Sequence, residues 1–86
     1  MAANKEDVLA AVVRVLGPYI GKNLASASAR GHCEKFGFGP RLDDHDKARL
    51  LDALSPGLNV FVGKRHAQTI VDEMRSAIDT LAEKSR

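Results

Sequence analysis

The sequence predicts an all-α fold, a single compact domain built as a bundle of four to five helices. Apolar residues recur at three- and four-residue steps over long segments, which is typical of helices with one buried face. Aromatic residues make up only 5% of the chain, so aliphatic residues and alanine must fill the core. Glycine and proline pairs divide the periodic segments, and 86 residues are enough for one domain.

The first helix is expected over residues 5–16. Asn4 is a good N-cap, and Glu6 and Asp7 place negative charge in the first turn, where the helix dipole favours it. Gly17-Pro18 then predicts a break or a sharp kink, because glycine ends helices and proline fits the first turn of a new one.

The second helix is expected over residues 18–36 and the third over residues 43–54. Gly31 costs the second helix about 1 kcal/mol relative to alanine. The composition of the segment from Gly37 to Pro40 predicts a loop between the two helices, and Asp43 or Asp44 caps the third.

Ser55-Pro56 is a further helix start signal, and it predicts a short fourth helix over residues 56–62. A short buried strand is the alternative, because Asn59 to Val62 is rich in β-forming residues and too short for periodicity to decide. The last helix, over residues 64–83, has the clearest amphipathic pattern in the chain. Its apolar stripe consists of Ala67, Ile70, Val71, Met74, Ala77, Ile78 and Leu81.

Composition and charge indicate a soluble cytoplasmic protein. Hydrophobic residues make up 44% and charged residues 28%, which excludes disorder. Cys33 is the one cysteine, so an internal disulfide is impossible and a reducing compartment is expected. The N-terminus lacks the pattern of a signal peptide, and no apolar run approaches the length of a membrane span. We therefore expect no membrane partner. A net charge of +2 is too small to indicate nucleic-acid binding by itself.

Residues capable of catalysis or metal binding do not form a known pattern. His32, Cys33, His45 and His66 match no common zinc spacing. Cys33 as a nucleophile would need a nearby base and a lowered thiol pKa, and a small helical domain offers little cleft for a substrate. The acidic residues after position 42 lack the central Gly and terminal Glu of a calcium loop. We expect a protein that is not an enzyme and has no cofactor or metal.

The leading functional prediction is a non-catalytic regulatory or protein–protein interaction module that associates with itself. The first helix carries apolar residues on nearly two faces, more than one small bundle covers, and surplus apolar surface is typical of interfaces. The expected contact residues are Val8, Val12, Val15, Tyr19 and Ile20. The partner is a protein, either a second copy in a homodimer or another chain. The alternative is that the first helix is simply the most buried helix of the bundle.

A small DNA-binding transcriptional regulator is the alternative function. Lys64 and Arg65 open the last helix, where they could contact phosphates, and Gln68 could reach a base edge. Against this, Gly63 falls where a helix-turn-helix needs an apolar core residue. The segment from Leu16 to Gly21 is similar to helical modules appended to bacterial signalling proteins, over too short a stretch to transfer residue roles or a function.

Overall fold

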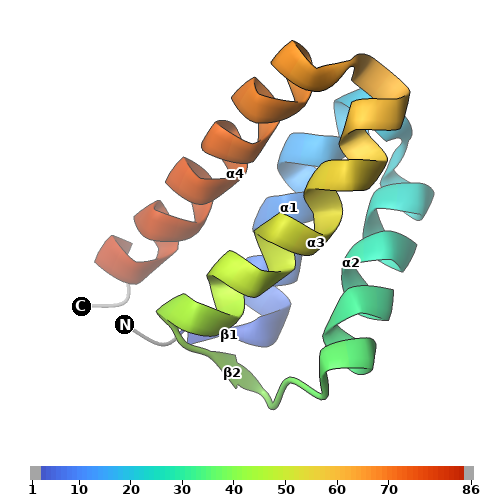
Figure 1. Cartoon of the computed structure of the whole chain (residues 1–86). Helices are drawn as coiled ribbons and strands as arrows, with labels where there is room; N and C mark the ends of the chain where they lie inside the picture. Colours follow the sequence, from blue (N-terminus) through green and yellow to red (C-terminus); the bar gives the residue numbers. More distant parts are fainter. Residues whose placement is uncertain (1–2, 85–86) are drawn as a thin grey trace.

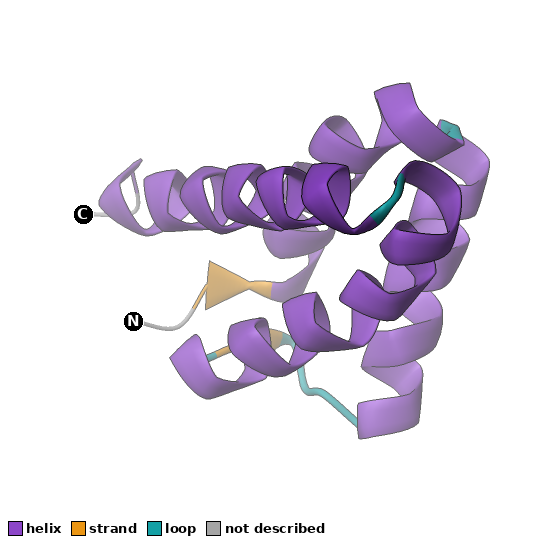
Figure 2. Cartoon of the chain, turned by 45° about the horizontal axis from the view of Figure 1, so that its top comes forward, coloured by secondary structure: helices purple, strands orange, loops and turns teal. Residues whose placement is uncertain are grey.

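The computed structural model of the chain describes residues 3–84, and these form four helices and one short pair of strands (Figures 1 and 2). The all-α prediction is confirmed. The elements are β1 (Ala3–Asn4), α1 (Lys5–Ile20), α2 (Lys22–Phe36), β2 (Arg41–Leu42), α3 (Asp44–Val62) and α4 (Lys64–Lys84).

The four helices run alternately up and down the bundle (Figure 1). The α1–α2 turn and the α3–α4 turn therefore lie at the same end, and the β1–β2 pair lies at the opposite end. Helices α1 and α3 each contact all three other helices, and α1 packs most extensively against α2 and α4. This arrangement buries two sides of α1 and leaves a third side open.

Helix α1 continues through Gly17-Pro18, so the predicted break at residue 16 is wrong. The helix ends at Gly21, whose backbone leaves helical geometry with φ 92° and whose N–H donates to the Gly17 carbonyl at 2.8 Å. Pro18 lies in the last helical turn, where its missing N–H removes a single ladder bond, to the Arg14 carbonyl. Near a helix end this loss is tolerated, and the second helix begins only at Lys22.

Helix α3 is one continuous helix, so the predicted division into 43–54 and 56–62 is wrong, and so is the strand alternative. A capping box starts it: the Asp43 side chain accepts from the Asp46 N–H at 2.8 Å, and the Asp46 carboxylate accepts from the Asp43 N–H at 3.3 Å. Pro56 lies inside the helix at an exposed position. Leu54 and Leu58 are buried on either side of it, and burying this stripe outweighs the roughly 3 kcal/mol that an interior proline costs.

The β1–β2 pair was not predicted, because two residues per strand are too few to show alternation in a sequence. Ala3 pairs with Leu42 in antiparallel register, and the Lys5 N–H donates to the Pro40 carbonyl at 2.8 Å. The Leu42 side chain is fully buried. The pair thus fastens the loop before α3 to the beginning of α1.

The core is aliphatic, as the sequence predicts. The largest fully buried side chains are Val8, Val12, Leu16, Leu42, Leu50, Leu51, Ile70, Met74 and Ile78. They include Ile70, Met74 and Ile78 from the stripe of α4, the helix that packs against α1 and α3. Within residues 3–84 no helix combines the length and apolarity that crossing a bilayer requires.

Candidate interaction surface

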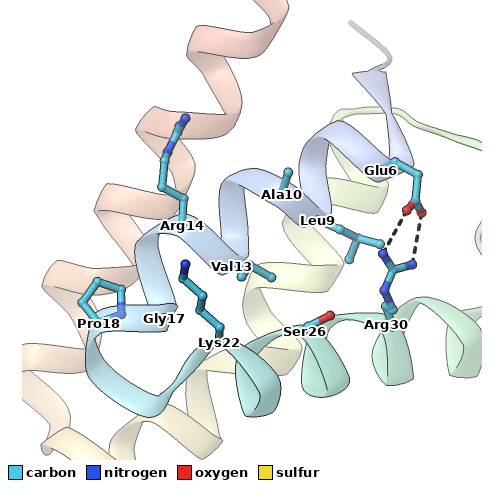
Figure 3. A pocket seen from close by; sticks show the side chains of 10 residues that line it. All are labelled: Glu6, Leu9, Ala10, Val13, Arg14, Gly17, Pro18, Lys22, Ser26 and Arg30. Carbon is cyan, nitrogen blue, oxygen red and sulfur yellow. Dashed lines mark hydrogen bonds and ion pairs between the residues drawn. The ribbon is translucent and has the colours of Figure 1, made fainter.

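A groove of about 710 Å³ runs along the outer seam between α1 and α2 (Figure 3). It exists because α1 turns Val8, Val12 and Leu16 toward the core, which leaves the opposite side of the helix facing outward. Leu9 and Val13 form the apolar floor of the groove. The remaining lining residues are Glu6, Ala10, Arg14, Gly17, Pro18, Lys22, Ser26 and Arg30. Several of them are small, and that is why the seam is hollow.

An ion pair closes one end of this groove. The Arg30 guanidinium of α2 donates to both carboxylate oxygens of Glu6, at 2.9 and 3.3 Å. This hydrogen bonding lowers the pKa of the Glu6 carboxyl, since it favours the ionised form. At the other end, the Lys22 stem lies close to Gly17, where an added Cβ would stand 3.2 Å from the Lys22 Cγ. The Gly17 position therefore leaves room for the Lys22 side chain.

The Glu6–Arg30 pair makes a small part of the stability dependent on pH. The pKa of Glu6 is lower in the folded chain than in the unfolded chain. Its stabilisation is therefore present above the unfolded pKa and is lost as the pH falls through the folded pKa. We expect carboxyl NMR titration to place the Glu6 midpoint below the ordinary value and Arg30→Ala to return it, with Arg14→Ala as the control. An unchanged midpoint in Arg30→Ala would contradict the assignment.

Arg14 stands on the edge of the groove, and its side chain extends from α1 away from α2 (Figure 3). Asp7 is exposed on the same helix. Neither side chain has an ion-pair partner among residues 3–84. The outer face of α1 thus carries one uncompensated negative and one uncompensated positive charge.

The predicted contact residues on the first helix lie in different environments. Val8 and Val12 are completely buried in the core of this chain, so neither can form a surface contact in the folded protein. Val15 and Ile20 are partly buried against the same core. Tyr19 is 46% exposed. The alternative reading of the first helix, as the most buried one, accounts for the two core valines.

The residues predicted to contact DNA are all exposed at the beginning of α4. Lys64 and Arg65 follow Gly63, the single residue that separates α3 from α4. The Gln68 amide donates one hydrogen bond to the Asp72 carboxylate at 3.2 Å, which a contact through that N–H would have to replace. Lys64 and Arg65 are exposed to a partner.

The histidines and the cysteine are not gathered into one site. His32 stacks on Phe36, His45 is at the start of α3 and His66 is at the opposite end of the bundle. Among the described residues no group of three or more possible metal ligands occurs. Burial raises the pKa of the Cys33 thiol, which keeps it in its unreactive protonated form. Its position therefore does not favour nucleophilic chemistry.

Among the residues whose burial the structure describes, four large apolar side chains are exposed, and all lie near the two helix turns at one end of the bundle. They are Tyr19, Leu24, Val60 and Phe61. Phe61 and Ile20 line a second pocket, of about 280 Å³, so the end of α3 lies close to the end of α1. Sequence periodicity missed Val60 and Phe61 because the residues from Leu58 to Val62 are almost all apolar and show no polar face.

Comparison with family models, with curated proteins and with solved structures gave no match for this chain.

Proposed function

We propose that this chain is a non-catalytic regulatory module that acts by protein–protein contact and associates with a second copy of itself. The contact is the outer face of α1, beside the groove shared with α2. This differs from the surface expected from sequence, because Val8 and Val12 belong to the core. Ala10, Val13 and Arg14 take their place as contact residues.

The observation that carries the proposal is the position of the two uncompensated charges. Asp7 and Arg14 are seven residues apart, almost two helical turns, so they lie on the same side of α1. The midpoint between them falls beside Ala10. If α1 of a second copy packs antiparallel about that midpoint, Asp7 of each copy faces Arg14 of the other. An isologous contact of this kind forms two equivalent ion pairs, each between Asp7 of one copy and Arg14 of the other.

The residues between the charges suit close packing of two helices. Ala10 is exposed and small, so the two helix axes can approach to the 8–10 Å that is usual for packed helices. Val13 is partly buried and supplies apolar surface next to it. The groove offers further room for side chains of the second copy. Charge pairing sets the direction of such a contact, and apolar packing supplies its free energy.

A charge swap tests this contact. We expect sedimentation equilibrium over a range of concentrations to show a monomer–dimer equilibrium. Arg14→Asp should raise the dimer dissociation constant about tenfold or more, because two ion pairs become two repulsions. Asp7→Arg should do the same, and the double variant Asp7→Arg with Arg14→Asp should restore association.

Arg75→Asp is the matched control, since Arg75 is exposed on α4 and away from this face. It makes the same change in net charge and should leave the dissociation constant unchanged. A chain that remains strictly monomeric at millimolar concentration would refute self-association. Failure of the double variant to recover would refute the antiparallel contact through α1.

DNA binding through Lys64 and Arg65 is the second candidate. It is favoured by the exposure of both cations and by the absence of carboxylates between residues 53 and 71. It is opposed by the engaged Gln68 amide and by Asp72 and Glu73 farther along the same helix. Titration with duplex DNA at two salt concentrations tests it, because phosphate contacts require affinity to fall steeply as salt rises.

A further inference from the structure

Among the residues that the structure describes, the end of the bundle that holds the two helix turns carries no Asp or Glu side chain. We call this region the turn end; it comprises residues 19–24 and 60–65. Figure 2 brings this end forward, with the short loops of both turns in teal. The sequence has no Asp or Glu in residues 8–33 or in residues 53–71, so all 11 carboxylates lie elsewhere along the chain. The turn end carries the cations Lys22, Lys64 and Arg65.

The same end holds the exposed large apolar side chains. Val60 is 85% exposed and Phe61 59% exposed, while Tyr19 and Leu24 are nearly half exposed. Leaving such side chains in water forgoes the free energy that burial would provide, so a cluster of them commonly marks a contact surface. Here the cluster and the cations occupy one end of the molecule.

We propose that the turn end docks on an anionic lipid surface, with the apolar side chains in the interfacial region and the cations among the headgroups. The two features together are those of proteins that lie on membranes without crossing them. The contact requires no spanning helix, so it is compatible with the helices described above. It uses a different surface from the outer face of α1, and the two proposals can fail separately.

A lipid surface fits the turn end better than a second copy does. Two copies joined end to end would bring six cations together with no carboxylate to balance them. A lipid surface also fits the geometry. The exposed apolar side chains come from the ends of three helices, α1, α2 and α3. A soft planar interface can accept such separated anchors at the same time.

Vesicle co-sedimentation tests the proposal directly. We expect the whole chain to bind vesicles of phosphatidylserine and phosphatidylcholine, to bind phosphatidylcholine alone far more weakly, and to dissociate as salt rises. Lys64→Gln with Arg65→Gln should lower partitioning about 30-fold, since each cation contributes about fivefold. Val60→Ser with Phe61→Ser should lower it at least about tenfold. Circular dichroism confirms that each variant is folded.

The matched control is Lys35→Gln with Arg75→Gln. Both side chains are exposed and lie outside the turn end, and the change in net charge is the same. This variant should retain most of the vesicle binding. An equal loss in the control would show that only net charge matters, and that result would overturn the proposal.

A fluorescent reporter tests insertion while keeping an apolar side chain at the position that it occupies. The chain has no Trp, so Val60→Trp introduces a single reporter at the most exposed of the four positions. Its emission should shift to shorter wavelength on anionic vesicles and be quenched by brominated lipid. Ala48→Trp, at an exposed position near the start of α3, should show neither change.

Three further results would overturn lipid docking. The first is no binding to phosphatidylserine vesicles at low salt. The second is vesicle binding without a change in the Val60→Trp emission, which would indicate a purely electrostatic contact. The third is salt-sensitive binding to duplex DNA in the absence of vesicle binding, which would assign Lys64 and Arg65 to nucleic acid instead.

Discussion

Val12→Asp is expected to destabilise the chain strongly. Val12 is completely buried where α1 meets the rest of the core, and an unpaired charge there costs about 4 kcal/mol or more. A domain of this size has a total stability of about 4–13 kcal/mol, so the variant should lose at least about a third of its free energy of unfolding, and all of it at the lower end of that range. Far-ultraviolet circular dichroism with urea titration would measure the loss.

Ala10→Asp is the matched control for that variant. Ala10 lies on the same helix, but its side chain is exposed at the edge of the groove. This variant should keep the wild-type free energy of unfolding to within about 1 kcal/mol, most of the loss being the lower helix propensity of Asp. If Val12→Asp folded as stably as Ala10→Asp, the placement of α1 in the core would be wrong.

Pro56→Ala is expected to stabilise the protein by about 2 kcal/mol. Proline inside a helix costs about 3 kcal/mol relative to alanine, and the greater freedom of the unfolded alanine variant offsets part of the gain. The ring is exposed and belongs to no buried cluster, so its removal opens no cavity. The new N–H can donate to the Asp52 carbonyl and complete the ladder of α3.

Thermal unfolding should show this gain as a rise in Tm of roughly 10 °C. Pro40→Ala is the control, because Pro40 lies in the loop before β2 and uses only its carbonyl, which accepts from Lys5. Pro40→Ala should not raise Tm. A lower Tm in Pro56→Ala would mean that the bend imposed by proline is needed for Leu54 and Leu58 to reach the core together.

The sequence predicted the helices that have a clear polar face. The stripe of α4 is buried as expected, because its apolar residues alternate with charged ones at helical steps. Local signals misplaced the boundaries at Gly17-Pro18 and Ser55-Pro56. Each of these dipeptides resembles a helix boundary, but α1 and α3 continue past them because packing against the other helices stabilises the helical conformation. A local sequence pattern does not show which distant residues a helix will pack against.

The candidate surfaces were harder to predict than the fold. Helix α1 has apolar residues on most of its circumference, and only the packing of three neighbouring helices shows which of them remain outside. The sequence does not distinguish Asp7 and Arg14 from other charged surface residues. Only the structure shows that neither side chain forms an ion pair with the described residues. The turn end unites two segments about 40 residues apart, which no spacing rule connects.

Each pair of neighbouring helices at the turn end is separated by a single glycine. Gly21 and Gly63 both have positive φ with extended ψ, a conformation that essentially only glycine adopts. A side chain at residue 63 would be strained at this positive φ. The reversal of the chain from α3 into α4 within one residue therefore depends on glycine, and a substitution there would cost stability although no neighbouring atom stands in its way.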